Sequence, residues 1–363
     1  MFDGTLGDWK HSAVSIKPKP DATPYHSKPY GVPHINEAPL RREVDRLCQI
    51  GVLKKQNESE WAAGAFIIPK TNGTVRFISD FRELNKRIVR KPFPIPKIQD
   101  LLQKLQGFRF ATSLDLNMGY FTIRLDPDAQ KLCTIILPWG KYSYMRLPLG
   151  VANSPDLFQE KMSELMAGLE FVRTYLDDVL VITKSSFEDH LNKLERVLAR
   201  LSEAGLKVNA PKCSFGRTSL EYLGYWLSRE GIAPTPKKIS AMQAIQPPTN
   251  ISTLRSFVGL INFYRDMWQH RSHLLAPLTT LLSKNIKWRW TDVEQRAFDD
   301  IKLMISRDVL LVYPDFSSAR SLKRHKFPTP LPNENFSPSW KRSKSIAISS
   351  WATPLRSIPI TKI

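Results

Sequence analysis

The chain has 363 residues, enough for two or three domains with a sizeable core, and its 42% hydrophobic content is ordinary for a globular protein. The net charge of +19 predicts a polyanionic partner, most often nucleic acid, although a basic but inert surface would have the same composition. No apolar run is long enough to span a bilayer, no signal peptide opens the chain, and the three cysteines fit neither a disulfide framework nor zinc spacing.

The N-terminal residues 1–35 are rich in proline and show little periodicity, which predicts an extended, stiff segment. Residues 40–48 then carry apolar side chains at helical spacing, ahead of a stop at Gly51. Residues 65–79 predict a β-hairpin around Asn72-Gly73, a strong turn signal. Lys70 and Arg76 lie on this hairpin, and the simpler interpretation of the residues alone is two solvated charges.

The central part of the chain alternates short strands and helices. Strands are expected over residues 108–114, 122–125, 133–137, 142–147 and 220–227. Helices are expected over residues 98–105, 154–168 and 191–205. The helix at 154–168 should pack behind the hairpin formed by residues 173–182. These elements predict an α+β fold in which an antiparallel sheet is backed by helices.

Two adjacent acids, Asp177 and Asp178, stand between apolar, β-favouring runs, which predicts a hairpin with the acids at its turn. Like charges at a turn repel, so either solvent or a hard cation such as Mg²⁺ must relieve them. The solvated turn is the simpler interpretation of this pair alone. Asp115 ends another apolar strand, and three carboxylates at neighbouring strand ends would suit a pair of divalent ions.

Beyond residue 234 the sequence becomes helical, over about residues 236–245, 251–268, 274–283 and 292–306. Lysines and arginines interleave with Trp268, Trp288 and Trp290 in this part. Tryptophans at helical spacing are more often core residues than nucleic-acid contacts, and we expect a core role here.

Several stretches, in chain order, resemble motifs of reverse transcriptases from gypsy-type LTR retrotransposons. They are Asp80-Phe81-Arg82-Glu83-Leu84-Asn85, Leu114-Asp115-Leu116-Asn117-Met118-Gly119-Tyr120, Leu147-Pro148-Leu149-Gly150, Ser154-Pro155 with Phe158-Gln159, Tyr175-Leu176-Asp177-Asp178, Tyr222-Leu223-Gly224-Tyr225 and the helix from Leu254 to Arg265. The match covers roughly residues 1–317 at the spacing of the family.

The resemblance implies a right-hand polymerase fold, with an antiparallel palm sheet, fingers hairpins and a helical thumb. It implies an RNA-directed DNA polymerase that acts on deoxynucleoside triphosphates and a primed RNA or DNA template. Its catalytic and metal-binding residues would be Asp115, Asp177 and Asp178, with two Mg²⁺ ions or Mn²⁺ in their place. Its substrate-binding residues would be Lys70, Arg76, Tyr120, Leu149, Gly150 and Gln159, and its primer-binding residues Leu223, Gly224 and Tyr225.

Tyr120 matches the aromatic gate that fills the space a 2′-hydroxyl would need, whereas the residue alone would be interpreted as a half-buried core tyrosine. The resemblance divides the chain into an N-terminal segment (1–35), fingers and palm (36–230), and a thumb or connection (231–317). An intracellular location follows, in a cytoplasmic particle or the nucleus. A catalytically silent remnant that only binds nucleic acid is the alternative.

The resemblance continues to residues 309–316, which lead into a ribonuclease H domain in this family, and then it stops. Residues 319–363 hold nine Lys and Arg against one Glu, so residues 1–318 keep a net charge of +11. Six prolines and many serines predict a disordered basic tail. A shifted reading frame or a degraded element would explain this ending.

Overall fold

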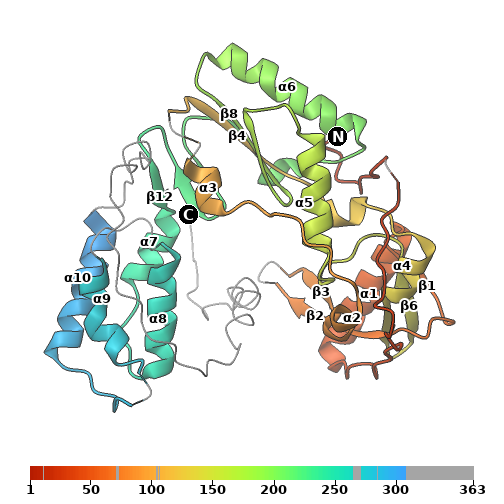
Figure 1. Ribbon diagram of the computed structural model, residues 1–363, viewed down its shortest axis with the longest axis horizontal. Helices are drawn as coiled ribbons and strands as arrows, with labels where there is room; N and C mark the ends of the chain where they lie inside the picture. Colours follow the sequence, from red (N-terminus) through yellow and green to blue (C-terminus); the bar gives the residue numbers. More distant parts are fainter. Residues whose placement is uncertain are drawn as a thin grey trace. The chain divides into compact units, whose positions relative to one another are not determined.

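The computed structural model describes residues 1–307, except 11, 71–72, 104, 106, 265–270 and 284 (Figure 1). Two compact units make up these residues. The larger holds residues 1–66 and 77–307, and the smaller is the hairpin tip, residues 67–76. The predicted tail, the stretch 309–316, and Asn72, Arg265 and Trp268 lie outside the described residues.

A four-stranded antiparallel sheet in the order β7-β8-β4-β9 carries the predicted catalytic acids. Its strands are β4 (Phe110–Asp115), β7 (Val172–Tyr175), β8 (Asp178–Thr183) and β9 (Ser214–Arg217). Val179 to Thr183 are all buried, because helices cover the sheet. The uninterrupted apolar run of β8 is therefore the pattern of a strand enclosed on both faces.

Helices α5 (Ser154–Leu165) and α6 (Phe187–Glu203) pack on this sheet, α5 against β7 and α6 against β8 and β4. The predicted packing of the first helix behind the hairpin is confirmed. A buried histidine fastens α6, since His190 Nε2 lies 2.7 Å from Thr112 Oγ1 of β4 and its Nδ1 lies 3.1 Å from Thr183 Oγ1 of β8. Burial lowers the pKa of His190, so the neutral ring is favoured in this position.

A second sheet has the strand order β1-β6-β5-β2-β3. Its strands are β1 (Leu53–Lys55), β2 (Ala63–Pro69), β3 (Val75–Ser79), β5 (Thr134–Leu137) and β6 (Gly140–Tyr144). The helices of this part of the chain are α1 (His34–Gln49), α2 (Arg82–Arg87), α3 (Ile98–Gln103) and α4 (Pro127–Leu132). Leu40, Val44 and Leu47 form the buried stripe of α1, as their helical spacing predicted.

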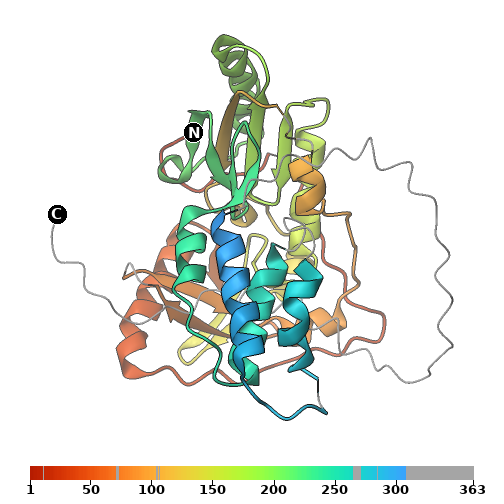
Figure 2. The same ribbon diagram turned by 90° about the vertical axis from the view of Figure 1, so that its left-hand side faces the viewer.

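The C-terminal part of the described chain joins a three-stranded sheet to four helices. The strands are β10 (Leu220–Tyr222), β11 (Tyr225–Leu227) and β12 (Ile232–Pro234). The helices are α7 (Pro236–Gln243), α8 (Ile251–Phe263), α9 (Arg271–Thr280) and α10 (Asp292–Arg307). Helix α10 packs on α9 and α7, and α9 packs on α8 (Figure 2). Trp288 and Trp290 pack against the apolar core of this region, which confirms the core role expected for them.

The N-terminal segment is extended, as its prolines predicted, and touches the rest of the chain through isolated β-bridges. These join Val14 to Leu125, Pro18 to Ile88 and His26 to Ala62. None of the described helices is long and apolar enough to cross a membrane.

Two local expectations were wrong, and two short helices were missed. Residues 122–125 are no strand, because Thr122 ends the 3₁₀ helix η1 (Gly119–Thr122) and only isolated bridges follow, from Arg124 to Arg146 and from Leu125 to Val14. Helices α2 and α4 were missed, although Asp126 caps α4 through the Ala129 N–H ahead of Pro127, a readable start signal. The acidic hairpin turns at Leu176-Asp177 rather than Asp177-Asp178, since Tyr175 pairs with Asp178.

Candidate active site

The three predicted catalytic acids meet at one end of the β7-β8-β4-β9 sheet. Asp115 and Asp178 are Cα partners across β4 and β8, and Asp177 occupies the turn before Asp178. The Leu116 N–H donates to the carbonyl of Asp177 at 3.2 Å, which ties the end of β4 to this turn. Residues far apart in sequence are therefore brought together by strand pairing.

The carboxylates influence each other. Burial, and then the charges of Asp177 and Asp115, raise the pKa of Asp178 to about 6. The pKa of Asp177 is also raised, first by burial and then by Asp115. Burial is the larger cause for both acids, and the like charges of their neighbours add to it because the carboxylates lie near one another.

One cation of the chain already lies beside these acids. Lys212 Nζ stands 3.2 Å and 3.3 Å from the two carboxylate oxygens of Asp115, and Lys212 belongs to the 3₁₀ helix η2 (Ala210–Lys212). The Asn209 N–H donates to the Asp115 carbonyl at 2.9 Å, which holds this turn in place. Sequence reasoning missed Lys212, because its nearness to Asp115 depends on how β9 pairs with β4.

Carboxylate oxygens are the donors that Mg²⁺ prefers, so the chemistry of the three acids fits this ion. Among the described residues, however, no group of three His, Cys, Asp or Glu side chains converges closely enough to hold a metal ion. Mg²⁺ is commonly bound by one or two carboxylates together with substrate phosphates rather than by a closed protein cage. Asp115 and Asp178, as register partners, are the pair best placed for that arrangement.

Gln159, predicted to bind substrate, is fully buried on α5. Its Oε1 accepts a hydrogen bond of 2.7 Å from the Leu176 N–H, and its Nε2 lies 3.2 Å from the hydroxyls of Thr174 and Ser163. Leu176 has a φ of 54°, a conformation that costs free energy for a leucine. The Gln159 amide therefore supports the strained turn that carries Asp177.

Tyr120 lies on η1, near the turn that carries Asp177. Its ring is stacked on Phe158 of α5, with centroids 4.9 Å apart. Burial raises the pKa of the Tyr120 hydroxyl, and the charge of Asp177 raises it further. This predicted gate residue is thus placed beside a predicted catalytic acid.

The Leu149-Gly150 loop is attached to the motif at residues 80–85. Asn85 Nδ2 donates to the Gly150 carbonyl at 2.9 Å, and Asn85 Oδ1 accepts from the Ala152 N–H at 2.7 Å. Leu149 is 57% exposed, which leaves its side chain available to a ligand. The asparagine amide thus holds the loop from both sides.

The predicted primer-binding residues form the tight turn between β10 and β11, where Tyr222 pairs with Tyr225. Leu223 and Gly224 have φ values of 50° and 81°, the positive pair typical of a type I′ turn. A Cβ atom at Gly224 would lie 2.8 Å from Lys238 Nζ. Lys238 is therefore a cation held against this turn, which sequence reasoning did not assign to the site.

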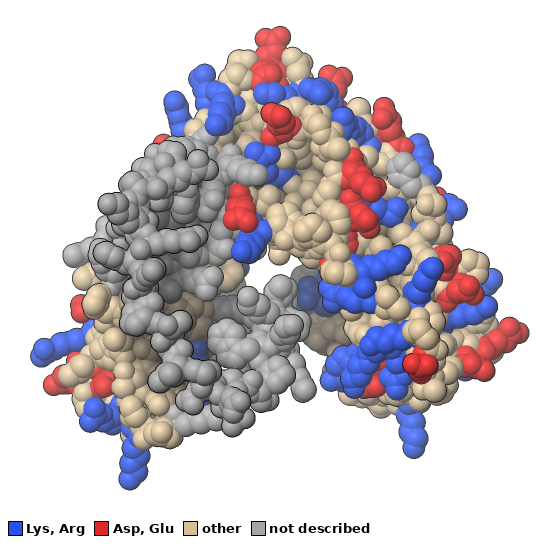
Figure 3. Space-filling view, viewed as in Figure 1, with Lys and Arg blue, Asp and Glu red and all other residues tan. Residues whose placement is uncertain are grey.

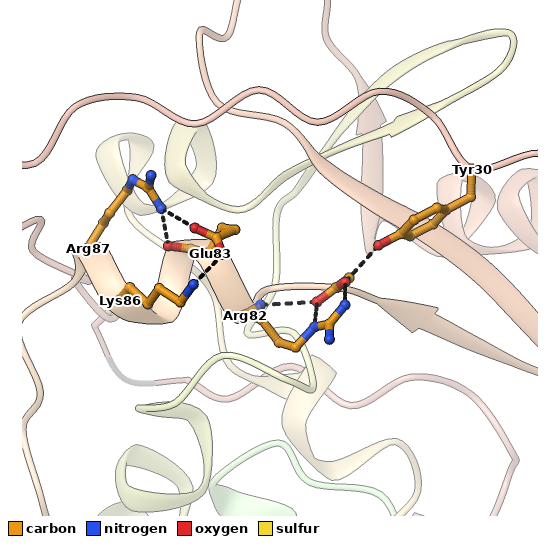
Figure 4. Close-up of polar contacts among 6 residues, drawn as sticks. Tyr30, Arg82, Glu83, Lys86 and Arg87 are labelled. Carbon is orange, nitrogen blue, oxygen red and sulfur yellow. Dashed lines mark hydrogen bonds and ion pairs between the residues drawn. The ribbon is translucent and has the colours of Figure 1, made fainter. Parts of the chain in front are cut away.

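A polar network surrounds α2, in the motif at residues 80–85 (Figure 4). Asp80 accepts from Nε and Nη2 of Arg82 at 2.7 and 2.6 Å, and from the Tyr30 hydroxyl at 2.7 Å. Glu83 pairs with Lys86 at 2.5 Å and Arg87 at 2.7 Å. Lysine and arginine side chains gather over this helix (Figure 3), and Arg82 is 82% exposed. These cations suit contact with a phosphate backbone.

Asp80→Asn should destabilise the fold by about 0.5–1 kcal/mol at neutral pH, a modest cost because Arg82 is open to solvent. Arg82 lowers the pKa of Asp80 from 3.8 to about 2, so the stabilisation is complete above pH 4 and is lost as the pH falls toward 2. Urea denaturation at pH 7, 5 and 3 should therefore show that the free energies of unfolding of wild type and variant differ by the same amount at pH 7 and 5, and by less at pH 3. If the two free energies of unfolding differ by the same amount at all three pH values, the stabilisation by Asp80 is not ionic.

Lys70 and Arg76 belong to the smaller unit, the hairpin tip. The Lys70 N–H donates to the Thr74 carbonyl at 2.7 Å, and the Gly73 N–H donates to the Lys70 carbonyl at 3.1 Å, which closes the predicted turn. The contact of Lys70 and Arg76 with a triphosphate stays a prediction.

Comparison with known proteins shows which family the chain resembles. Residues 68–227 match the family described as reverse transcriptase (RNA-dependent DNA polymerase). Solved structures agree: the foamy viral protease-reverse transcriptase in complex with RNA/DNA hybrid has a TM-score of 0.78 at 25% identity, covering 85% of this chain and 42% of that one. Its dRH form in complex with double-stranded DNA has a TM-score of 0.80 at 24% identity, covering 85% and 54%. The predicted right-hand polymerase fold is confirmed.

The curated relatives are transposon polyproteins. The chain is 30% identical over 302 residues to the retrovirus-related Pol polyprotein from transposon 297 of Drosophila melanogaster, covering 81% of this chain and 28% of that protein. It is also 30% identical over 290 residues to the Tf2-3 polyprotein of Schizosaccharomyces pombe, covering 79% and 22%. The chain thus spans less than a third of either relative. The resemblance to reverse transcriptases of transposon polyproteins is confirmed, and the gypsy type stays a prediction.

Proposed function

We propose that this chain is an RNA-directed DNA polymerase that extends a primer by phosphoryl transfer. The primer 3′-oxygen would attack the α-phosphate of a deoxynucleoside triphosphate, and pyrophosphate would leave. The observation that carries the proposal is the register pair Asp115–Asp178 with Asp177 at the adjoining turn, within a domain that matches the reverse transcriptase family.

Asp115, Asp177 and Asp178 would hold two Mg²⁺ ions, or Mn²⁺ in their place. Divalent ions at this position supply a Lewis acid that favours loss of the 3′-hydroxyl proton and neutralises the triphosphate. The protein's own part is to hold the carboxylates at fixed strand ends. Lys212, 3.2 Å from Asp115, reduces the repulsion among them.

Contacts to the nucleotide, primer and template would come from five regions. Lys70 and Arg76 would grip the triphosphate, Leu149 and Gly150 would border the nucleotide, and Tyr120 would exclude a 2′-hydroxyl. The turn of Leu223, Gly224 and Tyr225 would seat the primer end, with Lys238 beside it. The cations of α2 would contact a template backbone.

Partners and domain limits follow from the same proposal. The foamy viral protease-reverse transcriptase, which shares this fold, has been solved in complex with RNA/DNA hybrid, and its dRH form in complex with double-stranded DNA. Both complexes support a template–primer duplex as the partner here. Residues 36–230 would form fingers and palm, and residues 231–317 the thumb. A cytoplasmic particle or the nucleus would be its place of action.

The test is primer extension on matched RNA and DNA templates, with Mg²⁺ or Mn²⁺, at several salt concentrations. We expect extension on both templates, and duplex affinity that falls steeply with salt because the chain carries a net charge of +19. A folded protein that binds duplex yet adds no nucleotide with either metal would refute the polymerase proposal. That outcome would favour a catalytically silent remnant that only binds nucleic acid.

A further inference from the structure

Three aromatic rings connect the N-terminal segment to the predicted nucleotide site. The Trp9 indole is 3% exposed and meets the Phe158 ring edge to face, with centroids 6.2 Å apart and 74° between planes. Phe158 is stacked on Tyr120, with centroids 4.9 Å apart and 24° between planes. In a close-packed interior a displacement of the first ring is passed on to the third.

The backbone that carries Tyr120 is closely packed against its neighbours. A Cβ atom at Gly119 would lie 3.0 Å from Phe158 Cζ and 3.4 Å from Asp177 Cβ, so η1 is wedged between α5 and the catalytic turn. The position of Phe158 therefore sets the position of Tyr120 relative to Asp177.

Trp9 is held by its backbone on two sides. The Trp9 N–H donates to the carbonyl of Thr122 at 2.9 Å, and the Asp8 N–H donates to the carbonyl of Gly205 at 2.9 Å. A Cβ atom at Gly205 would lie 2.0 Å from the Asp8 carbonyl oxygen, which shows how closely the segment is seated. Asp8 also accepts from Arg146 Nη1 at 2.7 Å. These hydrogen bonds fix the backbone of Asp8 and Trp9, and they therefore fix the place from which the indole extends.

Trp9 also borders a cavity of about 580 Å³, which is further lined by Ser12, Lys161 and Arg200. Lys161 Nζ lies over the indole, 5.8 Å from its ring centroid, and this flexible side chain offers no aromatic replacement for the contact with Phe158. Loss of the indole would leave a void into which Phe158 and then Tyr120 could retreat.

We propose that Trp9 is a positioning residue for nucleotide selection, because it fixes the ring of Tyr120 through Phe158 and so determines how strictly ribonucleotides are excluded. The inference rests on the proposed polymerase function and on Tyr120 as the sugar gate. A ring that is held firmly fills the space of a 2′-hydroxyl, whereas a ring that retreats admits it.

The test compares kcat/KM for dATP and ATP in single-nucleotide extension by the full chain. The variants are Trp9→Ala, Trp9→Phe, Tyr120→Ala as the reference for an open gate, and Ile16→Ala as the control. Ile16 is 1% exposed in the same segment, so its truncation tests general damage to the segment. We expect Trp9→Ala to lower the dATP/ATP preference about tenfold, Trp9→Phe to restore most of it, and Ile16→Ala to leave it unchanged.

An unchanged preference in a folded Trp9→Ala protein that binds duplex normally, together with a lowered preference in Tyr120→Ala, would overturn the role of Trp9 alone. A wild-type chain that adds no nucleotide, or a Tyr120→Ala variant with full preference, would overturn the proposed function or its gate, and the inference with it. If Trp9→Ala fails to fold, Trp9→Leu, which keeps an apolar body for docking, decides by the same ratio.

Discussion

Replacing Asp177 by Asn should reduce primer extension by about three orders of magnitude or more, while duplex affinity stays within about twofold. The substitution removes one negative charge from the three-carboxylate group and changes almost no volume. The turn should survive, because it is held by backbone bonds: the Asp177 carbonyl accepts from Leu116, and the Leu176 N–H donates to Gln159.

The same variant should be at least as stable as the wild type. Burial and the charge of Asp115 raise the pKa of Asp177, which means that its ionised form is disfavoured in the fold. A neutral amide relieves that repulsion. Activity lost with stability kept or gained is the pattern of a residue retained for chemistry rather than for folding.

Asp128→Asn is the matched control, since Asp128 is 86% exposed and pairs only with Lys131 at 3.4 Å among the contacts described. It should extend primers at the wild-type rate. Single-turnover extension, duplex binding and thermal unfolding together make the comparison. Extension by Asp177→Asn at more than a tenth of the wild-type rate would remove the proposed metal-binding role of this acid.

Gln159→Leu should lower kcat about 10- to 100-fold, with KM for the nucleotide nearly unchanged. Leucine keeps the apolar volume but offers no acceptor, so the Leu176 N–H loses its 2.7 Å bond inside the protein. An unsatisfied buried donor costs about 1–3 kcal/mol, and here that cost falls on a turn that is already strained. Asp177, the next residue, would lose its defined position.

Thr174→Val separates this effect from general damage near α5. It removes one acceptor of the Gln159 Nε2 group but leaves the bond from Oε1 to the Leu176 N–H. We expect less than about a threefold change in kcat. Steady-state kinetics of both variants would also discriminate between two roles for Gln159. A raised KM with normal kcat would support the substrate contact that sequence analysis predicted, and would contradict support of the turn.

The apolar runs beside each aspartate placed the three acids at strand ends, and their meeting was implied by the resemblance to reverse transcriptases. The partners that surround them could not be anticipated. Lys212 reaches Asp115 through the pairing of β4 with β9, whose register shifts between Ala111 and Ser113, and no local pattern encodes such a shift. Helices and strands could be predicted from the sequence where their hydrophobic periodicity is strong. Helices α2 and α4 have six residues each and are too short to show a helical period.

The N-terminal segment illustrates the same limit. Its prolines predicted an extended chain, and the chain is extended. The hydrogen bonds from Trp9 to Thr122 and from Asp8 to Gly205 join residues that are far apart in sequence. They depend on how closely the two backbones approach, which no local sequence pattern encodes. Gln159 shows a related case, because its motif could be recognised while the burial of its amide depends on packing around α5.

Among the described residues, the non-glycine residues with positive φ are Met118, Leu176 and Leu223. One precedes the turn of Tyr120, one precedes Asp177, and one opens the turn before Tyr225. Each costs the fold about 1–2 kcal/mol relative to a residue that accepts this conformation. Laboratory selection for heat resistance alone should therefore drift toward glycine or asparagine at these positions, because both residues accept the same backbone conformation at a lower cost.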